Sequence, residues 1–117
     1  MHMNSSWMMR AGLLLRVLRL RAGLGQDALA DATGASQSTV SRWEQGLAVP
    51  DRRQVEKWFA ACRASDSHRD VLVDYLEADT PDQARAAMAE VEKVLIALVS
   101  DSGSVYDTTV PYFADVA

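Results

Sequence analysis

The sequence predicts an all-α fold in which five short helices are followed by a long C-terminal helix and an extended tail. Apolar residues recur at helical spacing along most of the chain, and glycine, proline and capping residues divide it into segments of helical length. The composition, 49% hydrophobic and 24% charged over 117 residues, is that of a globular protein. We expect a first domain at 8–64, a helical region at 65–101 and a tail at 102–117.

The first helix is expected at residues 8–22. Its leucines share one stripe and its arginines cover the remaining surface, a pattern typical of an amphipathic helix against a core. The stripe consists of Leu14, Leu15 and Leu18, and Val17 can extend it. Gly23 and Gly25 follow and end the helix.

The second and third helices are predicted on either side of Gly34. The second covers 26–33, and the third begins after Ser36, which is a good N-cap residue. Val40 and Trp43 are three residues apart on the third helix, so they share its buried face.

Capping patterns mark the beginnings of the later helices. Residues 51–54 form a capping box that opens the fourth helix. The fifth begins at Ser65 or Asp66, and the sixth begins at 80–83, where a cap is followed by proline and by glutamine at the third position. Residues 105–117, rich in valine and threonine, favour extended structure.

Charge is distributed unevenly along the chain. Residues 1–58 hold 8 Lys and Arg against 5 Asp and Glu, whereas residues 59–117 hold 4 against 11. The first half, at +3, can approach a polyanion, and the second half, at −7, would be repelled by it. We therefore expect the second half to point away from any nucleic acid.

Several classes of function lack the residues that they need. No apolar run approaches the roughly 20 residues of a membrane span, and no signal peptide is evident, which favours a cytoplasmic protein. Cys62 is the single cysteine, so an internal disulfide and a multi-cysteine metal site are excluded. We find no catalytic arrangement, phosphate loop or metal signature, and we predict no enzyme, metal or cofactor.

The third helix carries the pattern that favours a DNA-binding function. Opposite Val40 and Trp43, its surface holds amides, hydroxyls and one guanidinium, and no carboxylate. These residues are Gln37, Ser38, Ser41, Arg42 and Gln45. Glutamine pairs with adenine and arginine with guanine through two hydrogen bonds each, so this face suits the major groove.

The same stretch resembles the Cro/lambda-repressor (Xre-like) family of helix-turn-helix regulators over roughly residues 10–63. The shared residues are Leu18-Arg19, Gly23-Leu24, Gln26, Leu29-Ala30, Gly34, Ser36-Gln37, Thr39-Val40-Ser41-Arg42-Trp43-Glu44 and Gly46. The resemblance implies a five-helix lambda-repressor-like domain that binds palindromic operators as a homodimer.

The resemblance also implies a role for each matched polar residue. Base contacts fall to Gln37, Ser38, Ser41 and Arg42. Phosphate contacts fall to Gln26, Ser36, Thr39 and Gln45. Gln26 would also hydrogen-bond to Gln37, and Arg19 would form a salt bridge with Glu44, the only acid in the third helix.

The loop after the third helix departs from the family. It usually carries basic residues, whereas residues 47–49 are Leu-Ala-Val here. Arg52 and Arg53 follow at the start of the fourth helix. We expect these two arginines to replace the missing loop charges as phosphate contacts.

The sixth helix carries an apolar seam with alternating spacings of four and three residues. The seam consists of Ala84, Met88, Val91, Leu95 and Leu98, widened by Ala87, Val94 and Val99. It has two interpretations: a dimer interface formed by Met88, Val91, Leu95 and Leu98, or packing onto the fifth helix of the same chain. We favour the dimer, because two-fold operator binding requires one.

The sequence thus predicts a transcriptional regulator, a repressor that binds double-stranded operator DNA as a homodimer. An antitoxin that regulates its own operon, with the acidic C-terminal region binding a protein partner, would use the same DNA-binding face. Residues 106–117 are similar to the opening of a ligand-sensing domain of some helix-turn-helix regulators, which implies a third alternative: the N-terminal fragment of a longer sensor.

Overall fold

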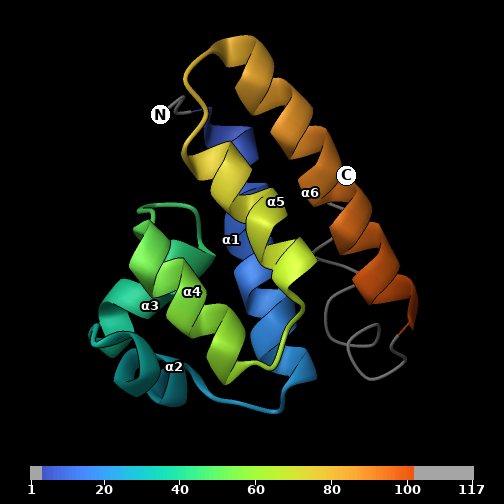
Figure 1. Cartoon of the computed structure of the whole chain (residues 1–117). Coiled ribbons are helices and arrows are strands. Elements are labelled where there is room, and N and C mark those ends of the chain that lie inside the picture. The colour runs from blue at the N-terminus through green and yellow to red at the C-terminus, as the bar shows by residue number, and fades with distance from the viewer. Residues whose placement is uncertain (1–3, 102–117) are drawn as a thin grey trace.

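A computed structural model describes residues 4–101 as six α-helices, with side chains described for 4–100 (Figure 1). The helices are α1 (Ser5–Arg21), α2 (Gln26–Thr33), α3 (Gln37–Glu44), α4 (Arg52–Ala61), α5 (Asp66–Leu76) and α6 (Pro81–Asp101). The prediction of an all-α fold with a long final helix is confirmed. The expected tail at 102–117 lies outside the described residues.

Side-chain caps begin the helices where the sequence indicates them. Ser36 and Ser65 each accept a hydrogen bond from the backbone N–H three residues later, and Asp51 and Gln54 form the reciprocal capping box of α4. Helix α1 begins three residues earlier than predicted, because Asn4 accepts from the backbone N–H of Trp7 at 3.2 Å. Local hydrogen bonding therefore fixes the helix starts.

Helix α1 is the centre of the structure. Helix α3 packs on one side of α1 and α6 packs on the other. Helix α4 contacts the middle of α1, where the Trp58 indole N–H donates to the Leu15 carbonyl oxygen at 3.1 Å. The predicted single leucine stripe is therefore too narrow. Leu13 is also fully buried, as is Val17 at the edge of the predicted stripe, because neighbours cover α1 on more than one face.

One hydrophobic cluster runs through all six helices. It joins core residues of α1 to α4 with Leu72 and Tyr75 of α5 and with the apolar seam of α6. The cluster has members on both sides of the expected boundary at residue 64, and that boundary stays a prediction. No helix among the described residues is both long and apolar enough to cross a membrane.

The interpretation of the α6 seam as a dimer interface is corrected by the packing. Met88, Val91, Leu95 and Leu98 are 0–7% exposed within a single chain. The seam lies against α5 and α1 of the same chain, so its width comes from covering two helices rather than one helix and a partner. The alternative, packing onto α5, was correct but omitted α1.

Candidate nucleic-acid interface

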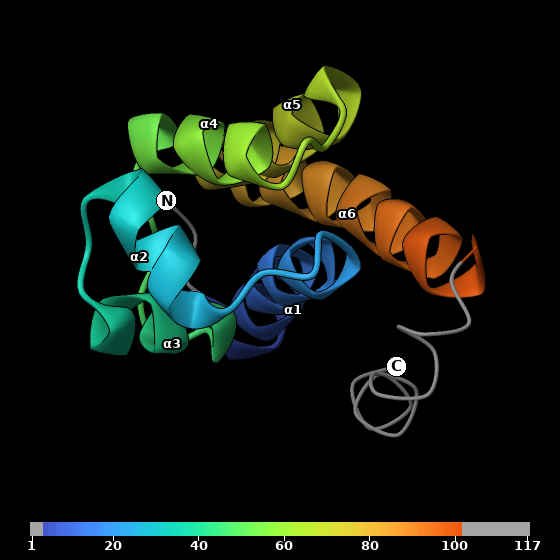
Figure 2. The same cartoon turned by 90° about the horizontal axis from the view of Figure 1, so that it is seen from below.

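Helices α2 and α3 are joined by a tight turn at Gly34. Gly34 has φ of 76°, a left-handed conformation that residues with a side chain rarely adopt, and the N–H groups of Gly34 and Ala35 both bond to the Ala30 carbonyl oxygen. Ser36 then caps α3. Two short helices thus meet in a helix-turn-helix arrangement at one end of the molecule (Figure 2).

Helix α3 turns one face into the core and the other to the solvent. Val40 is fully buried and Trp43 is 3% exposed, with its ring edge-on to Trp58 at a centroid distance of 6.2 Å. The polar residues predicted to contact DNA lie on the other side. Gln37, Ser38, Arg42 and Gln45 are exposed, and Thr39 and Ser41 are half-buried.

Hydrogen bonds within α3 hold several of these polar groups. The Ser36 hydroxyl accepts from the Thr39 N–H and donates to the Thr39 hydroxyl at 2.9 Å. The Gln45 amide donates to the Ser41 hydroxyl at 3.0 Å. Ser36 and Thr39 therefore stabilise the start of the helix, whereas Gln37 and Arg42 project from its surface.

A buried ion pair connects α3 to α1. The Arg19 guanidinium donates to both Glu44 carboxylate oxygens, from Nε at 2.6 Å and from Nη2 at 2.9 Å, and to the Leu24 carbonyl oxygen at 3.0 Å. The Glu44 side chain is 4% exposed and that of Arg19 is 11% exposed. This is the pair that the resemblance implies, and it neutralises the only carboxylate of α3.

Comparison with known protein families matches residues 10–72 to the family described as a helix-turn-helix domain, which covers more than half of the chain. The chain belongs to this family. The match begins in α1 and ends within α5. Comparisons with curated proteins and with solved structures gave no match.

Gln26, the first residue of α2 in the helix-turn-helix domain, has a different partner from the expected one. Its amide nitrogen donates to Glu44 Oε1 at 3.1 Å, so its bond joins α2 to the ion pair rather than to Gln37. We call Arg19, Glu44 and Gln26 together the Arg19–Glu44–Gln26 network. Because it links α1, α2 and α3 at one buried carboxylate, it fixes the positions of α2 and α3 relative to α1.

Two glycines let the backbones of α1 and α3 touch, a feature that sequence reasoning missed. A Cβ at Gly12 would lie 2.5 Å from the Trp43 carbonyl oxygen, and one at Gly46 would lie 2.8 Å from the Met9 nitrogen. The sequence does indicate a close contact at Gly12, since glycine stands there in a leucine-rich helix where alanine would be the better helix former. The C-terminal end of α3 thus rests directly on α1.

The arginines at the start of α4 differ in their surroundings. Arg52 forms ion pairs with Glu77 at 3.2 Å and with Glu56 at 3.6 Å, all on the surface. Arg53 is exposed, and so is Leu47 in the preceding loop, at 63%. Arg53 is therefore the better placed of the two to meet a phosphate.

Proposed function

We propose that this helix-turn-helix protein is a sequence-specific transcriptional repressor that binds a palindromic operator in double-stranded DNA as a homodimer. The observation that carries the proposal is the solvent face of α3. It presents amides, hydroxyls and a guanidinium, and the one carboxylate of the helix is buried and neutralised by Arg19. Such a face can approach phosphates and donate to base edges.

In this proposal the two helices divide the contacts. Helix α2 crosses the DNA backbone and α3 enters the major groove, where Gln37, Ser38, Ser41 and Arg42 contact base edges. Phosphate contacts come from Gln26, Ser36, Thr39, Gln45, Arg52 and Arg53. The network supports this division because Glu44 holds one N–H of the Gln26 amide, which leaves the other N–H to donate to a phosphate.

The acidic part of the chain lies away from the proposed DNA-binding face. Both views place α6 on the opposite side of α1 from α2 and α3 (Figures 1 and 2). Its carboxylates therefore add little repulsion at the duplex, because exposed charges farther apart than a Debye length of about 8 Å are largely screened at physiological salt.

The homodimer in this proposal requires a surface other than the α6 seam, since that seam is covered within the chain. Among the described residues, the exposed large hydrophobic side chains are Met9, Leu47 and Ile96. Helix α3, with eight residues, is about 12 Å long and contacts one half-site, so a palindrome needs two copies.

Selection of duplexes from a random pool by the purified protein at fixed salt tests the proposal. We expect an enriched inverted repeat. Arg42→Ala should relax the preference at one base pair, whereas Gln26→Ala should weaken binding to all duplexes alike. Arg85→Ala, an exposed arginine of α6, is the matched control and should select the wild-type repeat. A pool that shows no enrichment would refute the proposal.

A second candidate, an antitoxin that represses its own operon, is favoured by the acidic surface of α5 and α6. Asp70, Asp74, Glu77, Asp82 and Glu90 are all exposed there, which suits a basic protein partner. Deletion of the gene distinguishes the two roles. Loss of an antitoxin stops growth by freeing the toxin, whereas loss of a repressor alone raises transcription from its operator.

A further inference from the structure

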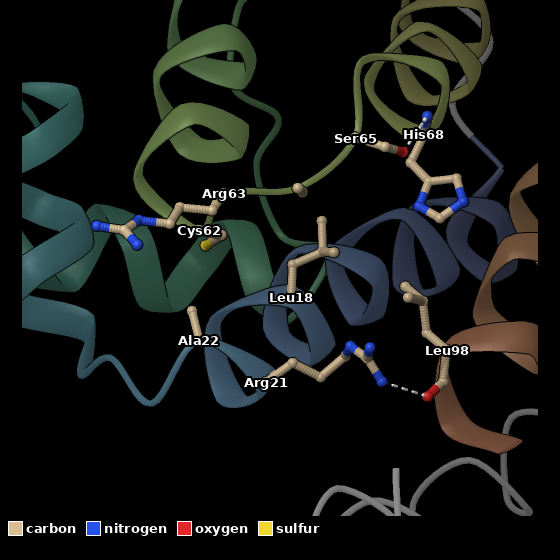
Figure 3. Close-up of a pocket in the computed structure, with 9 residues that line it drawn as sticks. Leu18, Arg21, Ala22, Cys62, Arg63, Ser65, His68 and Leu98 are labelled. Atoms are coloured by element: carbon tan, nitrogen blue, oxygen red, sulfur yellow. Dashed lines mark hydrogen bonds between the residues drawn. The ribbon is translucent and has the colours of Figure 1, made fainter. Parts of the chain in front are cut away.

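Helix α6 is held to α1 of its own chain, so the apolar seam of α6 faces that chain and not a second copy. Arg10 of α1 forms an ion pair with Glu92 at 3.4 Å. Arg21, at the C-terminal end of α1, donates to the Leu98 carbonyl oxygen at 2.9 Å, as Figure 3 shows. A homodimer must therefore use side chains that are exposed in the single chain.

Two of the three exposed large hydrophobic side chains among the described residues lie where the loop between α3 and α4 touches α1. Leu47 of this loop is 63% exposed, and Met9 of α1 is 37% exposed. The two backbones meet there, because a Cβ at Gly46 would lie 2.8 Å from the Met9 nitrogen. Ala48 and Val49 are half-buried, so Leu47 is the apolar side chain of the loop that the chain leaves uncovered. We call Met9 and Leu47 the loop patch.

The loop patch has a fixed position relative to α3. The Leu47 N–H donates to the Arg42 carbonyl oxygen at 2.9 Å, so Leu47 is bonded to the C-terminal end of the helix. Figure 1 shows the loop at the outer edge of the molecule. The N-terminal residues of a recognition helix contact base edges, so the loop patch leaves those contacts free. A two-fold axis beside it would set the distance between two α3 helices, which must match the half-site spacing of an operator.

The residues next to the loop patch are uncharged. Residues 45–50 contain no charged residue. The residues three and four positions from Met9 on α1 are Ser5, Ser6, Gly12 and Leu13. In a two-fold contact each copy presents the same surface, so a patch without charge meets its own copy without repulsion. The nearest exposed charges on either side of Leu47, those of Arg42 and Asp51, have opposite signs, so the rim carries no net charge.

Ile96, the third exposed large hydrophobic side chain, lies in charged surroundings. It is 54% exposed, and Glu92 and Lys93 precede it by four and three residues on the same side of α6. Their side chains are 47% and 72% exposed. Covering Ile96 would take these charges out of water, which costs free energy. Ile96 is therefore a poor contact for a second copy and a suitable control.

The size of the loop patch indicates how strongly two copies associate. Two side chains per copy are far less than the roughly 800 Å² that each partner buries in a standard stable interface. Free copies should therefore pair weakly. On an operator, two adjacent half-sites hold the copies at a high effective concentration, and a small apolar contact is then sufficient.

We propose that two copies of this chain meet through Met9 and Leu47 when they occupy the two halves of an operator, and that this contact makes their binding cooperative. The pairing rests on the proposed binding of a palindromic operator. It also explains how a homodimer forms although the α6 seam is covered within each chain.

Two duplexes separate the contact between copies from the contact with DNA. One is the inverted repeat enriched from the random pool, and the other keeps one half-site and has the second scrambled. Anisotropy titrations at fixed salt should show that wild-type protein fills the second half-site about tenfold or more tightly than the first, which is the effect of burying about one leucine side chain. Without DNA, the protein should sediment as a monomer at micromolar concentration.

Leu47→Ser should bring this cooperativity to within about twofold of none and leave the affinity for the single half-site unchanged. Because Leu47 is 63% exposed, the variant should keep the wild-type Tm. Met9→Gln should reduce the cooperativity as well, whereas Ile96→Ser, the matched control, should keep it in full.

Independent filling of the two half-sites by wild-type protein would overturn the pairing, and so would equal cooperativity in Leu47→Ser and Ile96→Ser. If Leu47→Ser weakens binding to the single half-site as much as to the repeat, Leu47 contacts DNA and the pairing is wrong. A random pool without enrichment would instead refute operator binding itself, and the pairing with it.

Discussion

The substitution Glu44→Gln should destabilise the protein strongly, because it removes the charge at the centre of the Arg19–Glu44–Gln26 network. The Glu44 side chain is 4% exposed and receives hydrogen bonds of 2.6, 2.9 and 3.1 Å from Arg19 and Gln26. Glutamine has nearly the same volume, so packing is preserved. The guanidinium of Arg19, 11% exposed, is left without a counter-charge.

Removing one partner of a buried ion pair costs about 3–5 kcal/mol in the free energy of unfolding. Glutamine retains one oxygen that can accept from Arg19, which places the expected loss near the lower end, about 3 kcal/mol. At roughly 4 °C per kcal/mol for a domain of this size, the Tm should fall by about 12 °C. Exposed pairs contribute far less, about 0–1 kcal/mol.

Urea unfolding followed by circular dichroism, at neutral pH and low salt, measures this loss. Glu77→Gln is the matched control, because Glu77 pairs with Arg52 on the surface, where both side chains are at least half exposed. The double substitution Arg19→Met with Glu44→Met should be more stable than Glu44→Gln, since it leaves no buried charge unpaired. A Glu44→Gln protein as stable as Glu77→Gln would refute the reasoning.

Three further predictions follow from the packing and from the Cys62 thiol. Gly12→Ala should lower the free energy of unfolding by about 1–3 kcal/mol, because the new methyl group would lie 2.5 Å from the Trp43 carbonyl oxygen; a rise in Tm would contradict the backbone contact. Leu95→Ala should cost about 2–5 kcal/mol and leave the dissociation constant of the proposed homodimer unchanged, since Leu95 is buried within one chain; a weakened dimer would restore the α6 seam as its interface. Because burial raises the pKa of Cys62 to about 11, the alkylation rate of the native protein should rise about tenfold per unit between about pH 8 and 10, and a plateau below pH 10 would contradict that shift.

Local sequence patterns predicted most of the fold, because each depends on a few neighbouring residues. Ser36, Ser65 and the capping box at 51–54 satisfy backbone N–H groups within one turn of the helix that they begin. Gly34 marks a turn that needs a positive φ. The inward direction of Val40 and Trp43 followed from helical spacing alone.

Local sequence patterns do not predict which helices pack against each other. The spacing of the α6 seam is the same whether it faces a partner or α1 and α5, so the sequence did not identify its neighbour. The structure likewise has no hydrogen bond between Gln26 and Gln37 where the resemblance implied one, because the partner of Gln26 depends on how the helices pack. The Gln26 amide donates to the Glu44 carboxylate instead. The packing of α1 against α3 brings the Glu44 carboxylate to that position.

The specificity ratio of the folded protein tests the central claim most directly. Fluorescence anisotropy at one fixed salt concentration compares a duplex enriched from the random pool with a scrambled duplex of the same composition. If the polar face of α3 contacts base edges in the major groove, the enriched duplex should bind at least about 10³-fold more tightly, and Arg42→Ala should reduce that ratio. Equal affinity for the two duplexes, in a protein with the wild-type Tm, would contradict the account.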